Sequence, residues 1–334
     1  MTNRERVLAT LRHEQPDFVP YNVEFTQKAR AVMVGYFGHS DFETALGNCL
    51  TLLDTNPANA WTETAPNVWR DPFGVLWDRS VDKDIGVVCN SLVTPENVHS
   101  FELPDPNDST RYEGFPKSKE QQDDRFIIAN LGFSLFERAW TLAGMENVLM
   151  GMVAQPEFVH ALLDRILEFN LAVIDRACKY AIDAMYFGDD WGSQRGLLMG
   201  RDLWRKFILP RARCMYSHVK KHGKFVFIHS CGKVDELFPD LIDAGIDVFN
   251  PFQPEVIDVF DAKARYGDRL CFHGGISTQQ ILPYATPHEV RTHVRQLLER
   301  VGENGGLFAS PAHAVPGDAR PENVAAMLDV LQNQ

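Results

Sequence analysis

A histidine and a cysteine two residues apart follow a short apolar run near the middle of this sequence. The run covers residues 225–228 and leads into His229, Ser230 and Cys231. Four apolar residues in succession, most of which favour β-structure, predict a strand buried on both faces, as in parallel sheets. Side chains at positions i and i+2 of an extended chain point to the same side, so His229 and Cys231 would converge. An imidazole and a thiolate are ligands that zinc prefers, although a buried structural thiol and a hydrogen-bonded histidine would show the same pattern.

Polar and titratable residues also follow the other predicted strands. In parallel α/β folds, reacting groups gather at the carboxyl ends of the strands. The residues at these ends are Glu24, Asn130, Asp189, Asp190, Gln194, His229, Cys231, Asn250, Gln253, His273 and His313. Asn250 and Gln253 are expected to have a structural role or to line a pocket, because such residues often cap the next helix. A helix cap does not require the two adjacent carboxylates of Asp189 and Asp190, so one of them could carry a proton or bind a cationic or hydroxyl group.

Two further histidines lie at predicted strand ends. His273 precedes two glycines, which would let a substrate approach the backbone. His313 follows the last predicted strand and would face His229 and Cys231. Two imidazoles and a thiolate leave one tetrahedral position of a zinc ion open, as in catalytic sites. A substrate thiol bound there would be deprotonated at neutral pH, whereas bound water would become hydroxide; the sequence leaves both uses open.

Strand and helix patterns alternate along most of the chain. Strands are expected at 21–25, 126–131, 184–188, 225–228, 247–250, 269–273 and 306–310, and helices at 3–13, 26–37, 134–144, 156–180, 202–222, 234–244, 258–266, 287–303 and 321–332. About eight strand and helix units predict an α/β fold of the (β/α)8 TIM-barrel type. Residues 55–125 lack the alternation and indicate a loop and hairpin insertion within a single domain of residues 1–334. No GxGxxG follows a strand, which argues against a dinucleotide-binding sheet.

Composition limits the function classes. Apolar residues make up 45% of the 334 residues and charged residues 23%, values that are ordinary for a soluble globular enzyme. A formal net charge of -12 argues against nucleic-acid binding. Six cysteines without a CxxC pair indicate reduced thiols, and no apolar stretch approaches the roughly 18 residues of a membrane span. We therefore expect a cytoplasmic enzyme that acts on a small molecule, without a membrane or nucleic-acid partner.

Several segments together resemble the uroporphyrinogen decarboxylase superfamily over nearly the whole chain. They are Arg-Glu-Arg-Val at 4–7, Pro-Asp-Phe-Val-Pro at 16–20, His-Ser-Cys-Gly-Lys-Val at 229–234, Gly-Ile-Asp-Val-Phe-Asn-Pro-Phe-Gln at 245–253, His-Gly-Gly-Ile at 273–276 and the ending at 316–327. The resemblance implies a (β/α)8 barrel with its active site at the carboxyl ends of the strands. It is much less specific for the activity, and two branches compete.

One branch consists of zinc-dependent methyltransferases that move a methyl group from a methylated corrinoid protein to coenzyme M or tetrahydrofolate. Its members carry His-x-Cys and a later cysteine as zinc ligands. His229 and Cys231 match the first two ligands, and His313 stands where the later cysteine is expected. The resemblance therefore implies zinc held by His229, Cys231 and His313. It also implies a separate corrinoid protein as partner, because the sequence shows no corrinoid-binding module.

The other branch removes carboxyl groups from the acetate side chains of uroporphyrinogen without a cofactor, using an amino-terminal arginine-rich motif and an aspartate. The matching place is 25–30, where Gln27 and Arg30 agree with the motif but Thr26 replaces an arginine. Few cations remain for so acidic a substrate. The alternative prediction is a metal-free decarboxylase in which Asp189 or Asp190 and His313 handle protons. The expected substrate contacts in either case are Glu24, Arg30, Asn130, Gln194, Asn250, Gln253 and His273. A barrel that only binds a ligand is a third, less favoured class, because so many strand ends are titratable.

Overall fold

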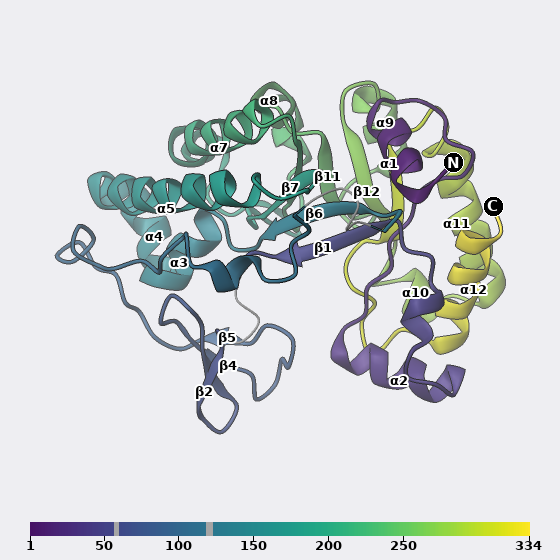
Figure 1. Cartoon of the computed structure of the whole chain (residues 1–334), viewed down its shortest axis with the longest axis horizontal. Helices are drawn as coiled ribbons and strands as arrows, with labels where there is room; N and C mark the ends of the chain where they lie inside the picture. Colours follow the sequence, from purple (N-terminus) through teal and green to yellow (C-terminus); the bar gives the residue numbers. More distant parts are fainter. Residues whose placement is uncertain (57–59, 118–122) are drawn as a thin grey trace.

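A curled, seven-stranded parallel sheet forms the centre of the protein, with helices around its outside (Figure 1). The structure is a computed structural model and describes residues 1–56, 60–117 and 123–334. The strands, in spatial order, are β1 (Leu50–Asp54), β6 (Phe126–Leu131), β7 (Ala184–Gly188), β10 (Phe225–His229), β11 (Val248–Phe252), β12 (Cys271–Ile276) and β13 (Leu307–Pro311). Each pairs in parallel with its neighbours. The predicted α/β, TIM-barrel-like architecture is confirmed at this level.

Residues 21–25, predicted as the first strand, lie between the two edges of this sheet. Tyr21 and Phe25 form isolated parallel bridges to Ala309 and Val315. On the other side, the Cys49 N–H donates to the Tyr21 carbonyl oxygen at 3.0 Å. The segment thus contacts both β13 and the start of β1, but it pairs at single points and not as a continuous strand.

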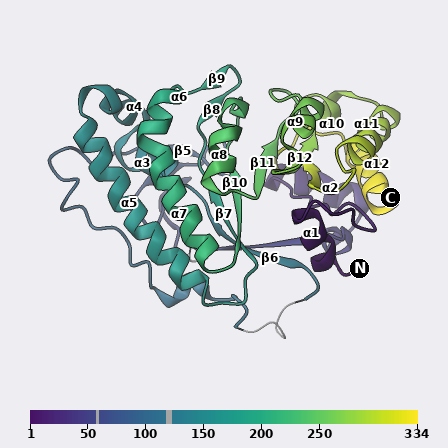
Figure 2. The ribbon, with the colours of Figure 1, turned by 90° about the horizontal axis from the view of Figure 1, so that it is seen from above.

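Helices flank the sheet on two sides, as the view from above shows (Figure 2). They are α1 (Asn3–Leu11), α2 (Gln27–Phe37), α3 (Phe136–Ala143), α4 (Met145–Ala154), α5 (Pro156–Ala177), α6 (Arg201–Leu203), α7 (Leu209–Lys221), α8 (Phe238–Ala244), α9 (Val259–Tyr266), α10 (Ile281–Tyr284), α11 (Pro287–Arg300) and α12 (Pro321–Gln332). Local sequence sets several ends. Thr286 and Glu289 form a reciprocal capping box at the start of α11, and Gly245 ends α8 in the left-handed conformation. No helix within the described residues is long and apolar enough to cross a membrane.

The structure differs from the predicted elements in two informative places. The helix expected over 202–222 is interrupted by a π-helical turn, Trp204–Ile208, ahead of α7. Pro210 has no N–H to donate to the preceding turn, which accounts for the widening there. Strand β1 was not predicted, because the residue types of Leu-Thr-Leu-Leu-Asp suit a helix or a strand equally well.

Residues 62–88 form a separate four-stranded antiparallel sheet. Its strands are β2 (Thr62–Ala65), β3 (Val68–Arg70), β4 (Leu76–Asp78) and β5 (Val87–Val88). It lies outside the central sheet, between β1 and β6 in the chain (Figure 1). Residues 57–59 and 118–122, which belong to the predicted insertion, lie outside the described residues. The division into one barrel domain with an insertion at 55–125 stays a prediction.

Alternate residues of the central strands pack in two separate layers. Those on the outer face, such as Ile127, Met185 and Val226, contact the helices. Those on the inner face form an apolar cluster that includes Phe126, Phe227, Val248, Cys271 and Phe308, closed from below by Val7 and Leu11 of α1. Because side chains alternate along a strand, the next inward positions are two residues further on. The apolar cluster therefore lies directly beneath the polar side chains at the carboxyl ends of the strands, and we call it the apolar floor.

Candidate active site

A small cavity of about 100 Å³ lies directly above this apolar floor, at the carboxyl ends of the strands. Its walls include Glu24, Tyr186, His229, Asn250, His273 and His313. Strand pairing explains part of this gathering, because Phe227 pairs with Val248 in the floor and His229 pairs with Asn250 one layer above. Five of the six side chains belong to the predicted site residues; Tyr186 was not predicted.

The three predicted zinc ligands converge beside this cavity, and two of them, His229 and His313, line it. One ligand atom from each of His229, Cys231 and His313 lies within 4.8 Å of the other two. The Cys231 Sγ is 3.3 Å from the His229 Nε2, and the His229 and His313 rings are 5.7 Å apart between centroids. A tetrahedral zinc ion would hold a sulfur and a nitrogen ligand about 3.6 Å apart. The donor set and its spacing therefore fit a zinc ion.

Hydrogen bonds to Asn250 determine which nitrogen of His229 is free. The Asn250 Nδ2 donates to the His273 carbonyl oxygen at 3.0 Å, which fixes the orientation of the amide. The Asn250 Oδ1 can then only accept, and it lies 2.6 Å from the His229 Nδ1 and 2.7 Å from the Tyr186 hydroxyl. His229 must therefore carry its proton on Nδ1, and the lone pair of Nε2 faces Cys231. Metal-binding histidines are oriented by the same kind of outer hydrogen bond.

Asp190 positions the cysteine. Its Oδ1 accepts the N–H of Cys231 at 2.7 Å and lies 3.6 Å from the His229 Nε2. Burial raises the pKa of the Cys231 thiol, and the negative charge of Asp190 raises it further. Without a cation the thiol is therefore held protonated, whereas a divalent ion between Cys231 and the two imidazoles would favour the thiolate.

Asp189 and Asp190 diverge despite being adjacent. The Asp189 carboxylate is buried and accepts hydrogen bonds from the Leu135 N–H, the Glu137 N–H and the Trp191 indole. Burial raises the pKa of Asp189 to about 6. Asp189 thus joins the end of β7 to the start of α3. Its side chain does not line the cavity, and its catalytic role stays a prediction.

Glu137, in the first turn of α3, is a titratable group that the sequence did not reveal. Burial raises its pKa well above the usual range, and the charges of Asp190 and Asp189 act in the same direction. Only the fold brings this carboxylate from α3 to the end of β7. In the sequence, a glutamate in the first turn of a helix is indistinguishable from an ordinary helix-stabilising residue.

His273 and Glu24 supply the remaining polar walls. His273 is 7% exposed, and neither ring nitrogen has a hydrogen-bond partner among the described residues. Burial lowers the pKa of His273 to about 4, with a further contribution from His229, so the ring is neutral. Glu24 accepts a hydrogen bond from Asn22 at 3.1 Å, and burial raises its pKa. Unpaired buried nitrogens are costly, which indicates that a ligand or water completes the His273 contacts.

Four residues that were predicted to contact the substrate do not line this cavity. Arg30 is 57% exposed on its side chain and pairs with Glu43 at 3.0 Å. Gln194 is exposed in the turn between β8 (Gly192–Ser193) and β9 (Gly196–Leu197). Gln253 is buried, and its carbonyl oxygen accepts two backbone N–H groups of the following turn. The Asn130 carbonyl oxygen accepts from Thr55. Of these four described residues, none lines the cavity, so their roles in substrate binding stay predictions.

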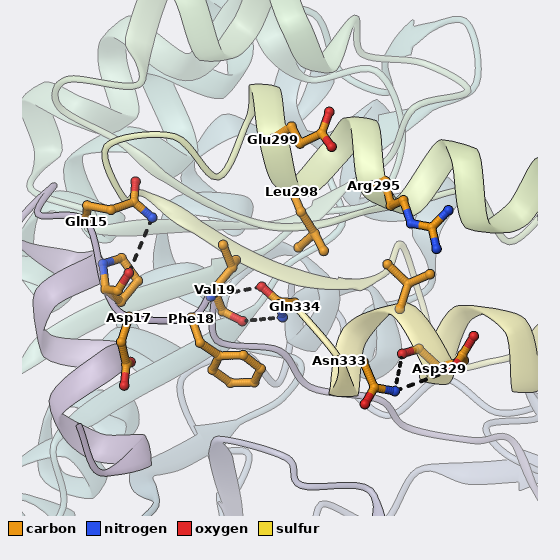
Figure 3. A pocket seen from close by; sticks show the side chains of 12 residues that line it. Gln15, Asp17, Phe18, Val19, Arg295, Leu298, Glu299, Asp329, Asn333 and Gln334 are labelled. Carbon is orange, nitrogen blue, oxygen red and sulfur yellow. Dashed lines mark hydrogen bonds between the residues drawn. The ribbon is translucent and has the colours of Figure 1, made fainter.

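A larger cavity of about 430 Å³ lies between residues 15–19, α11 and the end of α12 (Figure 3). The side-chain amide of Gln334 accepts from the Val19 N–H and donates to the Val19 carbonyl oxygen. Leu298 contributes an apolar wall, and Arg295 and Glu299 lie nearby. None of the residues predicted for chemistry lines this cavity, so it is not the candidate active site.

Comparisons with known proteins give the family of this chain and a solved structure of similar fold. The family model for uroporphyrinogen decarboxylase (URO-D) matches residues 79–334. Uroporphyrinogen decarboxylase from Methylococcus capsulatus is 24% identical over 265 residues, covering 72% of this chain and 70% of the relative. The enzyme of the same name from Aliivibrio fischeri strain MJ11 is 26% identical over 254 residues, covering 71% and 68%. The solved structure of a methyltransferase from Methanosarcina mazei superposes with a TM-score of 0.73 over 100% of this chain and 99% of that one. Its identity is 16%, so it shows likeness of fold.

Proposed function

This chain belongs to the uroporphyrinogen decarboxylase family, and we propose that its cavity is the active site of a zinc-dependent methyltransferase. His229, Cys231 and His313 would hold the metal ion. The methyl group would move between a separate corrinoid protein and a small acceptor, either a thiol or tetrahydrofolate. The observation that carries the proposal is the convergence of the three ligand atoms to within 4.8 Å of one another.

The ion and the surrounding residues would have different tasks. A bound zinc ion would lower the pKa of an acceptor thiol, which makes the acceptor a stronger nucleophile at neutral pH. Asn250 keeps the proton on the His229 Nδ1 and so leaves Nε2 free to bind. Asp190 holds the backbone of Cys231 in place. These contacts pre-organise the donor set, which limits the rearrangement that metal binding requires.

The cavity also suggests what kind of acceptor group enters it. The space between the side chains that line the cavity is about 100 Å³, so we expect only the reacting end of the acceptor to enter it. The neutral His273 ring offers one donor and one acceptor nitrogen, both without a protein partner in the described residues. Glu24 is the carboxylate in the wall and would receive the proton that the acceptor loses. We therefore expect the reacting end of the acceptor to be small and polar.

Decarboxylation is the second candidate, and the names of the curated relatives favour it. A substrate with several carboxylates needs cationic partners. Of the described residues that line the cavity, none is Arg or Lys. Arg30, the expected carboxylate partner, is engaged with Glu43. The charge of the cavity therefore supports methyl transfer over decarboxylation.

The test is metal analysis of protein purified without added metal or chelator. Cys231→Ser is compared with Cys214→Ser, which changes an exposed cysteine on α7. We expect Cys231→Ser to lower the zinc content by about one ion per chain relative to Cys214→Ser. The same pair is then assayed for methyl transfer from methylcobalamin to a small thiol. Equal zinc contents in the two variants would contradict the proposed metal site and return decarboxylation to first place.

A further inference from the structure

Two histidines and an aspartate meet on the outside of the barrel, between α5 and α7. Asp175 lies in the last turn of α5, and His218 and His222 lie at the end of α7. The Asp175 Oδ1 is 2.7 Å from the His218 Nε2 and 3.0 Å from the His222 Nε2. One ligand atom from each residue lies within 4.8 Å of the others. The two helices run side by side in both views of the fold (Figures 1 and 2).

The donor set is that of a divalent transition metal. Positions i and i+4 lie on one face of a helix, so His218 and His222 point together. Two imidazoles and a carboxylate suit Zn²⁺, Ni²⁺ or Cu²⁺, whereas Mg²⁺ and Ca²⁺ prefer oxygen ligands alone. Both Nε2 atoms already face the same Asp175 oxygen. A cation would replace the protons that these two hydrogen bonds need.

The surroundings also favour a cation. Both helices end at this place, and helix carboxyl ends carry partial negative charge. Two neighbouring ammonium groups are engaged elsewhere, because Lys220 pairs with Asp247 and Lys224 donates to the Ile182 carbonyl oxygen. The side chain of His222 is 35% exposed and that of Asp175 is 52% exposed. Solvent can therefore deliver an ion and complete its coordination.

We propose that Asp175, His218 and His222 form a second metal site, which binds Zn²⁺ or a similar divalent transition-metal ion and ties α5 to α7. None of the three residues lines the cavity at the strand ends, so this site is separate from the candidate active site. Residue 177 ends α5 seven residues before β7, and α7 ends four residues before β10. An ion here would brace the starts of the two strands that carry Tyr186 and His229.

The experiment is equilibrium dialysis of tag-free protein against Zn²⁺, followed by metal analysis. The double variant His218→Gln/His222→Gln is compared with His99→Gln/His288→Gln, which changes two exposed histidines elsewhere. We expect wild type and the control variant to retain about one more Zn²⁺ per chain than the first double variant. Asp175→Asn should weaken the binding of this ion at least ~10-fold, since even residues that only support a ligand contribute 10–100-fold to affinity.

A second measurement guards against loss of folding. Zn²⁺ should raise the Tm of wild type and of the control variant but not that of His218→Gln/His222→Gln. Mg²⁺ should give no comparable rise in Tm. Because Asp175, His218 and His222 are separate from the proposed zinc ligands at the strand ends, the variant Cys231→Ser should keep the extra ion. Equal Zn²⁺ content and equal Tm shifts in the two double variants would overturn the proposal. Unchanged affinity in Asp175→Asn would overturn the three-ligand assignment.

Discussion

Replacement of Asn250 by alanine tests whether the orientation of His229 prepares the site for a metal ion. The substitution removes the acceptor for the His229 Nδ1–H at 2.6 Å and for the Tyr186 hydroxyl at 2.7 Å. It also removes the donor to the His273 carbonyl oxygen. His229 can then rotate, or carry its proton on Nε2, and in either case the nitrogen that faces Cys231 is no longer held ready to bind.

The expected loss of zinc affinity is about 10–100-fold, the range for outer hydrogen-bond partners of metal ligands. This corresponds to about 1.4–2.8 kcal/mol of binding free energy. The free energy of unfolding should fall by about 3 kcal/mol, because three hydrogen bonds of about 1 kcal/mol net each are lost. The two effects are separable, since metal affinity is measured on the folded protein.

Tyr186→Phe is the matched control. It removes the hydroxyl, which lies 2.7 Å from the Asn250 Oδ1 and 3.1 Å from the His229 Nδ1, but leaves the bond between Asn250 and His229. We expect a loss of zinc affinity of less than ~10-fold. The assay is competition for zinc against a chromophoric chelator, with circular dichroism to confirm folding. A folded Asn250→Ala variant that binds zinc as tightly as wild type would refute the reasoning about His229.

Three further predictions concern the framework of the fold. Asp71→Ala should destabilise the protein by about 3–5 kcal/mol, because it leaves Arg138 buried without its partner; an unchanged urea midpoint would contradict this. Gly232→Ala should lower the free energy of unfolding by at least roughly 1–2 kcal/mol. Gly232 has a φ of +86°, and an added Cβ would lie 2.5 Å from the backbone carbonyl carbon of Gly192. Zinc binding should weaken in the same variant. Arg6 holds the pKa of Asp17 at about 2, so this carboxylate stabilises the fold above about pH 4 and the contribution is lost as pH falls towards 2. Thermal melts from pH 5 to 2 should therefore show Asp17→Asn less stable than wild type at pH 5 and equal to it near pH 2.

The elements that could be predicted were those with a local signal. Apolar runs bounded by polar residues marked β6 and β7 at their observed bounds, and Pro321 marked the start of α12. Strand β1 had no such signal, since its leucines and threonine suit a helix or a strand equally well. Its place is decided by pairing with β6, which the sequence does not display.

The same division applies to the candidate site. His229 and Cys231 could be recognised from their spacing at a strand end, and His313 from its place after the last strand. Tyr186 looked like a core residue of an apolar strand, because nothing local shows that its hydroxyl meets Asn250. Arg30 looked available for a substrate, and only its neighbour Glu43 shows that it is engaged.

The sequence by itself determined the parallel α/β class and which residue types stand at the strand ends, because both follow from the period of side chains along a strand. Tertiary structure alone decided which of these residues meet. The curl of the sheet brings His313, in the loop after β13, to His229 on β10. Strand register placed Asn250 beside His229 and thereby fixed the free nitrogen. Such contacts join residues that are far apart in the chain, and their geometry depends on the packing of the sheet and its helices.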